Sequence, residues 1–144
     1  MTQEDKELLL KDLSARLPYG VKVRTNRGPE IIEGLAPFCH NQVKIALNLD
    51  WSLSISDYTP YLRPMSSMTE EEKQELERLS EEYFGKALDK QIQESLSSSN
   101  KNESRILEYI ASSVIVDWLN KHHFDYRGLI EKGLALEAPE GMYK

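Results

Sequence analysis

The sequence predicts an α+β protein with an N-terminal helix, a four-stranded antiparallel sheet or small SH3-like barrel, and a helical C-terminal half. Three observations predict it: leucines at helical spacing near the N-terminus, alternating apolar and polar residues over 43–55, and long helical periodicity after residue 69. A chain of 144 residues has the usual size of one domain. We expect a helix plus β module at 1–64, with an acidic helical region at 65–144 packed on it in one compact domain.

The first helix is predicted from its N-cap and its leucines. The Thr2 hydroxyl can accept a hydrogen bond from a free backbone N–H, and Glu4 and Asp5 favour the positive end of a helix. Pro18 ends a run of leucines at helical spacing: Leu9, Leu10, Leu13 and Leu17. The sequence therefore predicts an amphipathic helix before residue 18.

A β-hairpin follows. Residues 21–24 alternate apolar and charged side chains, residues 26–29 have turn chemistry, and apolar residues resume at 31–32. We expect a loop around residues 36–38.

A longer alternating run supplies two more strands. Every odd position over 43–55 is apolar, which places one face of a strand in the core. Because this run is longer than most strands, we expect a turn near 48–50. Pro60 and Pro64 then leave room only for a short turn.

Two long helices are predicted in the second half. Thr69 and Glu72 form a capping box, and helical spacing continues through Leu88 and on toward Leu96, with Gly85 as a weak point. After a polar loop, a second helix carries a broad apolar stripe: Leu107, Ile110, Ala111, Val114, Ile115, Trp118 and Leu119.

A last short helix is expected over residues 126–132. Asp125 has the side chain of an N-cap, and Gly133 can take the left-handed conformation that ends a helix.

The composition predicts a cytoplasmic protein. The single cysteine, Cys39, allows no intrachain disulfide, and the acidic, polar N-terminus is unlike a signal peptide. No apolar run approaches the roughly 18 residues of a membrane span. We expect no membrane association.

The charge is unevenly distributed. Residues 1–64 carry equal numbers of acidic and basic side chains, so the net charge of −6 belongs to residues 65–144. Nucleic-acid binding is disfavoured, because phosphate backbones are bound by clustered Lys and Arg. The alternative is a weak local contact through the hairpin cations Lys22, Arg24 and Arg27, which Glu30 and Glu33 are expected to offset.

Four stretches resemble a known group of proteins. They are residues 13–23 (LSARLPYGVKV), 61–73 (YLRPMSSMTEEEK), 118–133 (WLNKHHFDYRGLIEKG) and 134–143 (LALEAPEGMY). In these stretches the chain resembles small uncharacterised proteins of intestinal anaerobic bacteria (Bacteroides-type) and of their phages and mobile elements. The resemblance implies an accessory protein acting inside a bacterial cell, and it assigns no activity, cofactor or residue role.

One alternative function is that of a small metal-dependent enzyme. His122, His123 and Asp125 are of the types that bind zinc or iron, and His40 could add a ligand. However, consecutive helical residues point about 100° apart, so both histidines reach one ion only if the helix ends there. Capping by Asp125 is the structural alternative.

Other catalytic motifs are missing from the sequence. Adjacent residues such as Cys39 and His40 rarely reach the geometry of a nucleophile and its base. The glycines form neither a dinucleotide fingerprint nor a phosphate loop. We therefore lean against an enzyme and expect no cofactor.

Aromatic residues suggest a binding groove in the β module. Tyr19, Tyr58, Tyr61 and Arg63 are the candidate binding residues, because aromatic grooves in SH3-like barrels hold extended peptides. Trp51 is one of the odd-numbered apolar residues of its strand, which are expected to face the core.

The function predicted from the sequence is that of a non-enzymatic binding or regulatory accessory protein. We expect a protein partner that contacts either the β module or the acidic helix after Thr69, and a homodimer is an alternative for the broad apolar helix faces.

Overall fold

A computed structural model shows the chain as two units. It describes the backbone of residues 1–25, 27–32, 34–38, 42–47, 50–51, 59–96 and 102–143, and the side chains of these apart from 34–38, 42–47, 50–51, 86–96 and 102–111. The β unit comprises Met1–Ser66 and Asn120–Lys144, and the helical unit is Ser67–Leu119. The chain is therefore grouped differently from the division expected at residue 65, because its last 25 residues belong with the N-terminal part.

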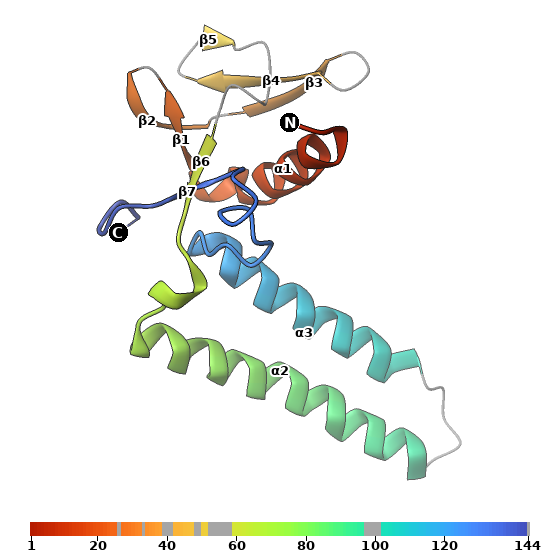
Figure 1. Cartoon of the computed structure of the whole chain (residues 1–144). Coiled ribbons are helices and arrows are strands. Elements are labelled where there is room, and N and C mark those ends of the chain that lie inside the picture. The colour runs from red at the N-terminus through yellow and green to blue at the C-terminus, as the bar shows by residue number, and fades with distance from the viewer. Residues whose placement is uncertain are drawn as a thin grey trace. The chain divides into compact units, whose positions relative to one another are not determined.

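The β unit contains short elements (Figure 1). In chain order they are α1 (Gln3–Arg16), η1 (Leu17–Tyr19), β1 (Lys22–Thr25), β2 (Gly28–Ile31), β3 (Gly34–Phe38), β4 (Gln42–Leu47), β5 (Asp50–Trp51), β6 (Thr59–Leu62), η3 (Met65–Ser67, which crosses into the helical unit) and β7 (Leu136–Glu137).

The strands form two sheets. The order is β2-β1-β6-β7 in one sheet and β3-β4-β5 in the other. All the pairings are antiparallel except β6 with β7, which run parallel with Tyr61 opposite Leu136. The α+β class is confirmed. The expected four-stranded antiparallel sheet or closed SH3-like barrel is wrong, since the described strands make a mixed four-stranded sheet that is open.

Three strands, β3, β6 and β7, occur where none was expected. The predicted loop around residues 36–38 is β3, which pairs with β4 over five residues. The predicted turn between Pro60 and Pro64 contains β6, in which Pro60 lies opposite Val23 of β1. The expected division of the run over 43–55 is seen as β4 and β5, while residues 52–58 lie outside the described part.

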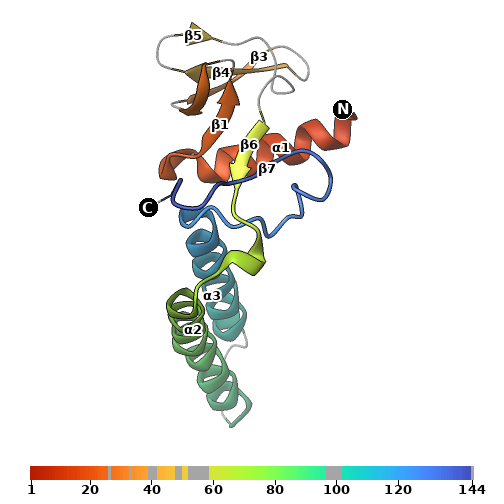
Figure 2. The same ribbon diagram turned by 60° about the vertical axis from the view of Figure 1, so that its left-hand side comes forward.

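The core of the β unit lies between α1 and the four-stranded sheet. Figure 2 shows α1 crossing beside β1 and β6. The helix begins as predicted, with Thr2 Oγ1 accepting from the Asp5 N–H at 3.1 Å and Asp5 Oδ2 accepting from the Thr2 N–H at 3.0 Å. The buried apolar cluster contains Leu9, Leu13, Val21, Val23, Ile32, Leu62, Leu129, Leu134 and Ala135.

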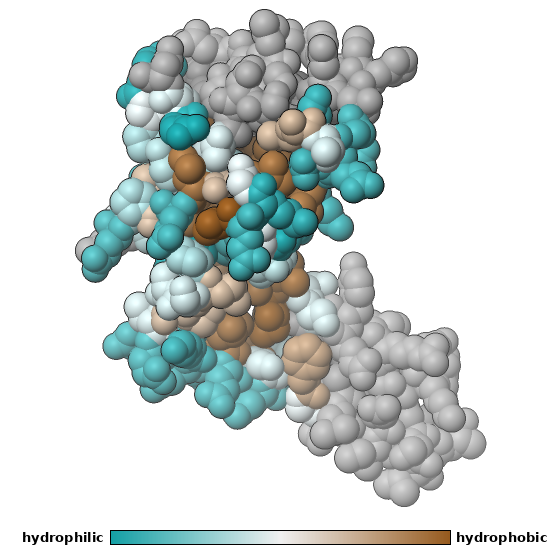
Figure 3. Space-filling model, viewed as in Figure 1, coloured by the Kyte–Doolittle hydropathy of each residue, from teal (hydrophilic) through white to brown (hydrophobic). Residues whose placement is uncertain are grey.

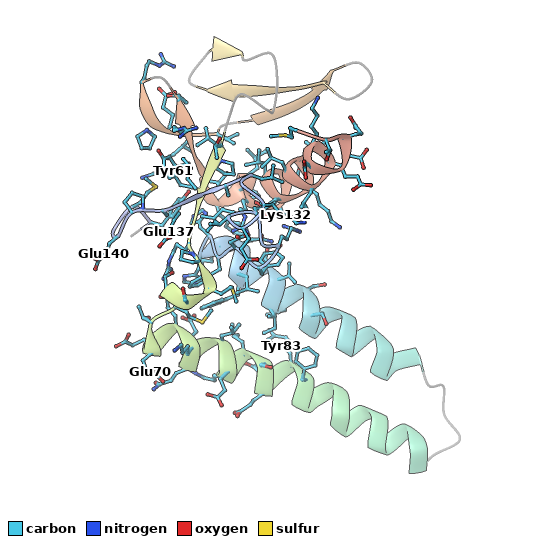
Figure 4. All side chains as sticks on the ribbon, viewed as in Figure 1. Tyr61, Glu70, Tyr83, Lys132, Glu137 and Glu140 are labelled. Atoms are coloured by element: carbon cyan, nitrogen blue, oxygen red, sulfur yellow. The ribbon has the colours of Figure 1, made fainter. Side chains whose placement is uncertain are left out.

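The helical unit is an antiparallel hairpin of α2 (Glu70–Leu96) and α3 (Asn102–Lys121) (Figure 1). The predicted capping box is present: Thr69 Oγ1 accepts from the Glu72 N–H at 3.2 Å, and Glu72 Oε1 accepts from the Thr69 N–H at 3.1 Å. Tyr83 projects from α2 toward α3 (Figure 4). Hydrophilic residues cover the start of α2, and hydrophobic residues gather between the helices (Figure 3).

The units differ in net charge. The helical unit carries the whole −6, and the β unit contains equal numbers of acidic and basic residues. Among the described residues, the structure contains no helix with both the length and the apolar character of a membrane span.

The last predicted helix is a series of turns instead. Residues 126–133 form turns, although Asp125 acts as the predicted cap: its two carboxylate oxygens accept from the Leu129 and Ile130 N–H groups, each at 2.9 Å. Gly133 has the predicted left-handed conformation, with φ +72°. The helix does not form because Gly128 is also left-handed, which interrupts the run two residues after it begins.

Candidate binding site

The site begins where α3 ends. His123 has φ +62°, a left-handed conformation that commonly terminates helices, and its N–H donates to the Asn120 carbonyl at 3.1 Å. The chain then pairs with the residue that follows β6. The Arg63 N–H donates to the His123 carbonyl at 2.8 Å, and the Asp125 N–H donates to the Arg63 carbonyl at 2.8 Å. These bonds hold the backbone from which the His123 side chain projects.

Tyr143 connects the C-terminal segment to His123. Its ring stacks on the His123 imidazole, with centroids 3.7 Å apart and planes at 18°. The Tyr143 hydroxyl accepts from the Lys22 backbone N–H at 2.8 Å and donates to the Tyr61 carbonyl at 2.7 Å. Figure 4 shows Tyr61 and Glu137 on the neighbouring strands β6 and β7. One phenol therefore joins the C-terminal segment to both β1 and β6.

The Lys22 side chain also contacts the C-terminal segment. Its Nζ donates to the Met142 carbonyl at 3.1 Å and lies 5.8 Å from the centroid of the Tyr143 ring. An ammonium can donate three hydrogen bonds, so one such contact leaves two donors for other acceptors.

A cavity of about 550 Å³ opens at these residues. Its basic lining residues are Lys22, Lys121, His122 and His123. Its aromatic and apolar lining is Tyr19, Tyr143, Ile31 and Met142, with Gly20 at the η1 turn. Of the described residues that line it, none is an aspartate or glutamate. We call this cavity the basic pocket.

A buried charge cluster lies nearby in the β unit. Asp12 and Arg16 are both fully buried, with Arg16 Nε 2.8 Å from Asp12 Oδ2 and Arg127 Nη1 2.7 Å from Asp12 Oδ1. Arg16 Nη2 also donates to the Phe124 carbonyl at 2.6 Å. One carboxylate faces two guanidinium groups, so the cluster has an excess of one positive charge.

The pKa of His123 is lowered by its surroundings. Burial is the largest cause, and together with the positive charges of Arg16, His122 and Arg63 it lowers the pKa of His123 to about 4, against an opposing hydrogen bond with the Tyr19 backbone. The imidazole is therefore neutral at pH 7. Its Nδ1 is buried without a hydrogen-bond partner among the described residues. Burial likewise raises the pKa of Tyr143 to about 12, which keeps the phenol protonated.

The predicted aromatic groove is only partly seen. Tyr19 lines the basic pocket, whereas Tyr61 and Arg63 are not among its described lining residues. Tyr61 contributes its carbonyl to Tyr143, and the Arg63 guanidinium lies 4.2 Å from the centroid of the Phe124 ring. Tyr58 lies outside the described residues, as does the side chain of Trp51.

The predicted metal ligands have other contacts. His123 is stacked on Tyr143, and both carboxylate oxygens of Asp125 accept backbone N–H groups. His122 lines the basic pocket. No three His, Cys, Asp or Glu side chains gather as a metal site within the described ranges. Cys39 and His40 lie outside those ranges.

The three hairpin cations are in different surroundings. Arg27 pairs with Glu30, as expected, with Nε 3.2 Å from Oε1. Arg24 is exposed on β1, and Lys22 lines the basic pocket. Glu33 lies outside the described residues.

Sequence reasoning missed Tyr143, Met142, Ile31 and Lys121 as members of one site. Lys22 was singled out, but as part of a hairpin patch. The contacts of Tyr143 join residues about 120 positions apart, and periodicity carries no information about such pairings.

Comparison with known proteins adds no relative, since no protein-family model, curated protein or solved structure matches the chain.

Proposed function

We propose that the protein is a non-enzymatic binding protein, and that the basic pocket receives an acidic segment of a protein partner. The observation that carries the proposal is the composition of the pocket. Two lysines line it beside the neutral His123 imidazole, and no described carboxylate does so. A lining of this kind attracts an oxyanion and excludes a cation.

The charges of the pocket remain available to a ligand. Within the described part of the chain, neither Lys22 nor Lys121 has a carboxylate at salt-bridge distance. The excess charge of the buried cluster at Asp12 adds to the same positive field. In a protein with a net charge of −6, such a concentration of positive charge favours a specific anionic ligand over general attraction.

The biological setting is a part of the same proposal. The resemblance of residues 61–73 and 118–143 to proteins of intestinal anaerobes and their mobile elements supports an accessory or regulatory role in a bacterial cytoplasm. The partner would then be a host or phage protein with an acidic segment.

A defined acidic peptide tests the proposal. We would measure the fluorescence anisotropy of labelled hexaglutamate and hexalysine on adding the full chain at low salt. We expect hexaglutamate to bind, hexalysine not to bind, and hexaglutamate affinity to fall as ionic strength rises to about 0.15 M, where the Debye length is about 8 Å.

Charge reversal localises the binding. Lys121→Glu changes an exposed residue of the pocket, and Lys11→Glu is the matched control, because Lys11 is also an exposed helical lysine but does not line the pocket. We expect Lys121→Glu to raise Kd about thirtyfold, since reversing a contact worth about 1 kcal/mol costs about 2 kcal/mol. Equal effects of the two variants, or no binding of hexaglutamate, would refute the proposal.

A further inference from the structure

The lining of the basic pocket includes nonpolar surface as well as positive charge. Ile31 is 47% exposed, and it lines the pocket with Met142. The rings of Tyr19, Tyr143 and His123 provide further nonpolar surface. A bare inorganic anion would contact none of this surface favourably.

The size of the cavity also indicates an organic ligand. A closed apolar cavity of about 150 Å³ holds one benzene ring, and small-molecule pockets span about 300–1,000 Å³. At about 550 Å³, the basic pocket has room for a ring and an attached charged group. Aromatic rings stack on one another with a gain beyond their buried area, so Tyr19 favours a flat ring over an alkyl chain.

We infer that the ligand group is an aromatic ring carrying, or directly beside, a carboxylate or phosphate. The oxyanion is held by the ammonium groups of Lys22 and Lys121, and the ring lies against Tyr19, Ile31 and Met142. This inference rests on the proposed function and specifies the chemistry of the segment that the partner presents, such as an aromatic residue with an adjoining acidic group.

The fixed parts of the site suit such a ligand. Lys22 Nζ is held at the Met142 carbonyl, and the Tyr143 ring is held by the His123 stack and two hydroxyl hydrogen bonds. A cation and a ring that are both fixed before binding lose little side-chain freedom on binding. The arrangement therefore binds a rigid aromatic anion without ordering these groups.

Small probes test the inference on the full chain. We would record two-dimensional NMR spectra while adding phenyl phosphate, benzoate, hexanoate, inorganic phosphate or phenol. We expect phenyl phosphate or benzoate to bind at least about tenfold more tightly than inorganic phosphate and phenol, and benzoate more tightly than hexanoate. The bound ring should shift the resonances of Tyr19 and Tyr143. The relative affinities of phenyl phosphate and benzoate identify which oxyanion is preferred.

Two variants separate the roles of ring and charge. Lys121→Ala should weaken phenyl phosphate and inorganic phosphate by a similar factor. Ile31→Thr keeps a β-branched residue on β2 and should weaken phenyl phosphate about threefold without affecting inorganic phosphate. Val116→Thr is its matched control, because Val116 is also an exposed β-branched residue, on α3 in the helical unit.

The outcomes distinguish this inference from the proposed function. It is overturned if phenol or hexanoate binds as tightly as the aromatic anions, if inorganic phosphate equals phenyl phosphate, or if no probe binds. Should hexaglutamate bind through Lys121 while the ring gives no gain, the pocket receives an acidic partner but is not selective for aromatics. Should phenyl phosphate bind and hexaglutamate fail, the site is real and its ligand is not an acidic protein segment.

Discussion

The imidazole of His123 and the phenol of Tyr143 stack with ring centroids 3.7 Å apart, which joins the end of α3 to the C-terminal segment. The stacked imidazole is neutral at pH 7, since burial and the nearby positive charges oppose its protonation. The stability of the β unit is therefore linked to the protonation state of one side chain.

Acid should destabilise the fold through His123. Its pKa is about 4 in the folded chain and about 6.5 when unfolded, so between these values the unfolded chain binds a proton that the folded chain does not. Stability from this residue is complete above pH 6.5 and declines as the pH falls toward 4, by about 3 kcal/mol at most. Urea unfolding at several pH values measures this loss.

His123→Asn isolates that contribution. Asparagine accepts the left-handed conformation and does not titrate, so the variant should lose less stability than the wild type between pH 7 and pH 4.5. His122→Asn, at the neighbouring position, is the control for removing an imidazole. If the wild type and His123→Asn lose the same free energy of unfolding over this range, the link between His123 and acid stability is wrong.

Tyr143→Phe should cost about 1–3 kcal/mol of unfolding free energy, because it leaves the Lys22 N–H and the Tyr61 carbonyl without their phenol partner. Tyr61→Phe is a close control, since Tyr61 contributes only its backbone carbonyl to this contact and the variant retains it. Chemical denaturation compares the two. An equal effect of both substitutions would argue against the hydroxyl as the link to β1 and β6.

Asp12→Asn should be strongly destabilising. The substitution leaves Arg16, which is fully buried, and Arg127 without a negative partner, and breaking a buried ion pair in this way costs about 3–5 kcal/mol. Glu7→Gln makes the same chemical change at an exposed position of α1 and should cost little. A loss below about 1 kcal/mol for Asp12→Asn would contradict the buried network.

Asp125→Ala should loosen the turns after α3. It removes the acceptor for the Leu129 and Ile130 N–H groups and should cost about 1–3 kcal/mol. Hydrogen exchange should accelerate at these two amides, while the exposed change Glu131→Ala leaves them protected. Unchanged exchange at both amides in Asp125→Ala would show that the carboxylate does not cap this segment.

The helices could be predicted because their determinants are local. Thr2 and Thr69 cap the helices that they precede, and each capping interaction spans three residues. Asp125 caps its segment as predicted, yet no helix follows. The reason is the left-handed conformation of Gly128, which its residue type permits but does not require.

The sheet was harder to predict because its pairings are distant. Pro60 and Pro37 lie within strands, although proline is uncommon inside a sheet and so argued against a strand at either position. The strand β7 is only two residues long. Its parallel pairing joins residues 61 and 136, and no local pattern specifies such a partner.

The site was the least predictable part. Tyr19 was identified from its residue type and its neighbours, and Lys22 from its charge. Their meeting with Met142 and Tyr143 depends on the C-terminal segment reaching β1, which only the tertiary structure specifies.

The helical unit is inserted into the β unit between residues 66 and 120, and this order along the chain has a kinetic consequence. The bonds of Arg63 with His123 and Asp125 close a loop of about sixty residues, and closure of a flexible loop becomes slower and entropically more costly as it lengthens. A helical hairpin forms from local contacts, which generally assemble faster than distant ones. We therefore expect α2 and α3 to form early and the pairing of Arg63 with Phe124 late, so the basic pocket is completed in the last steps of folding.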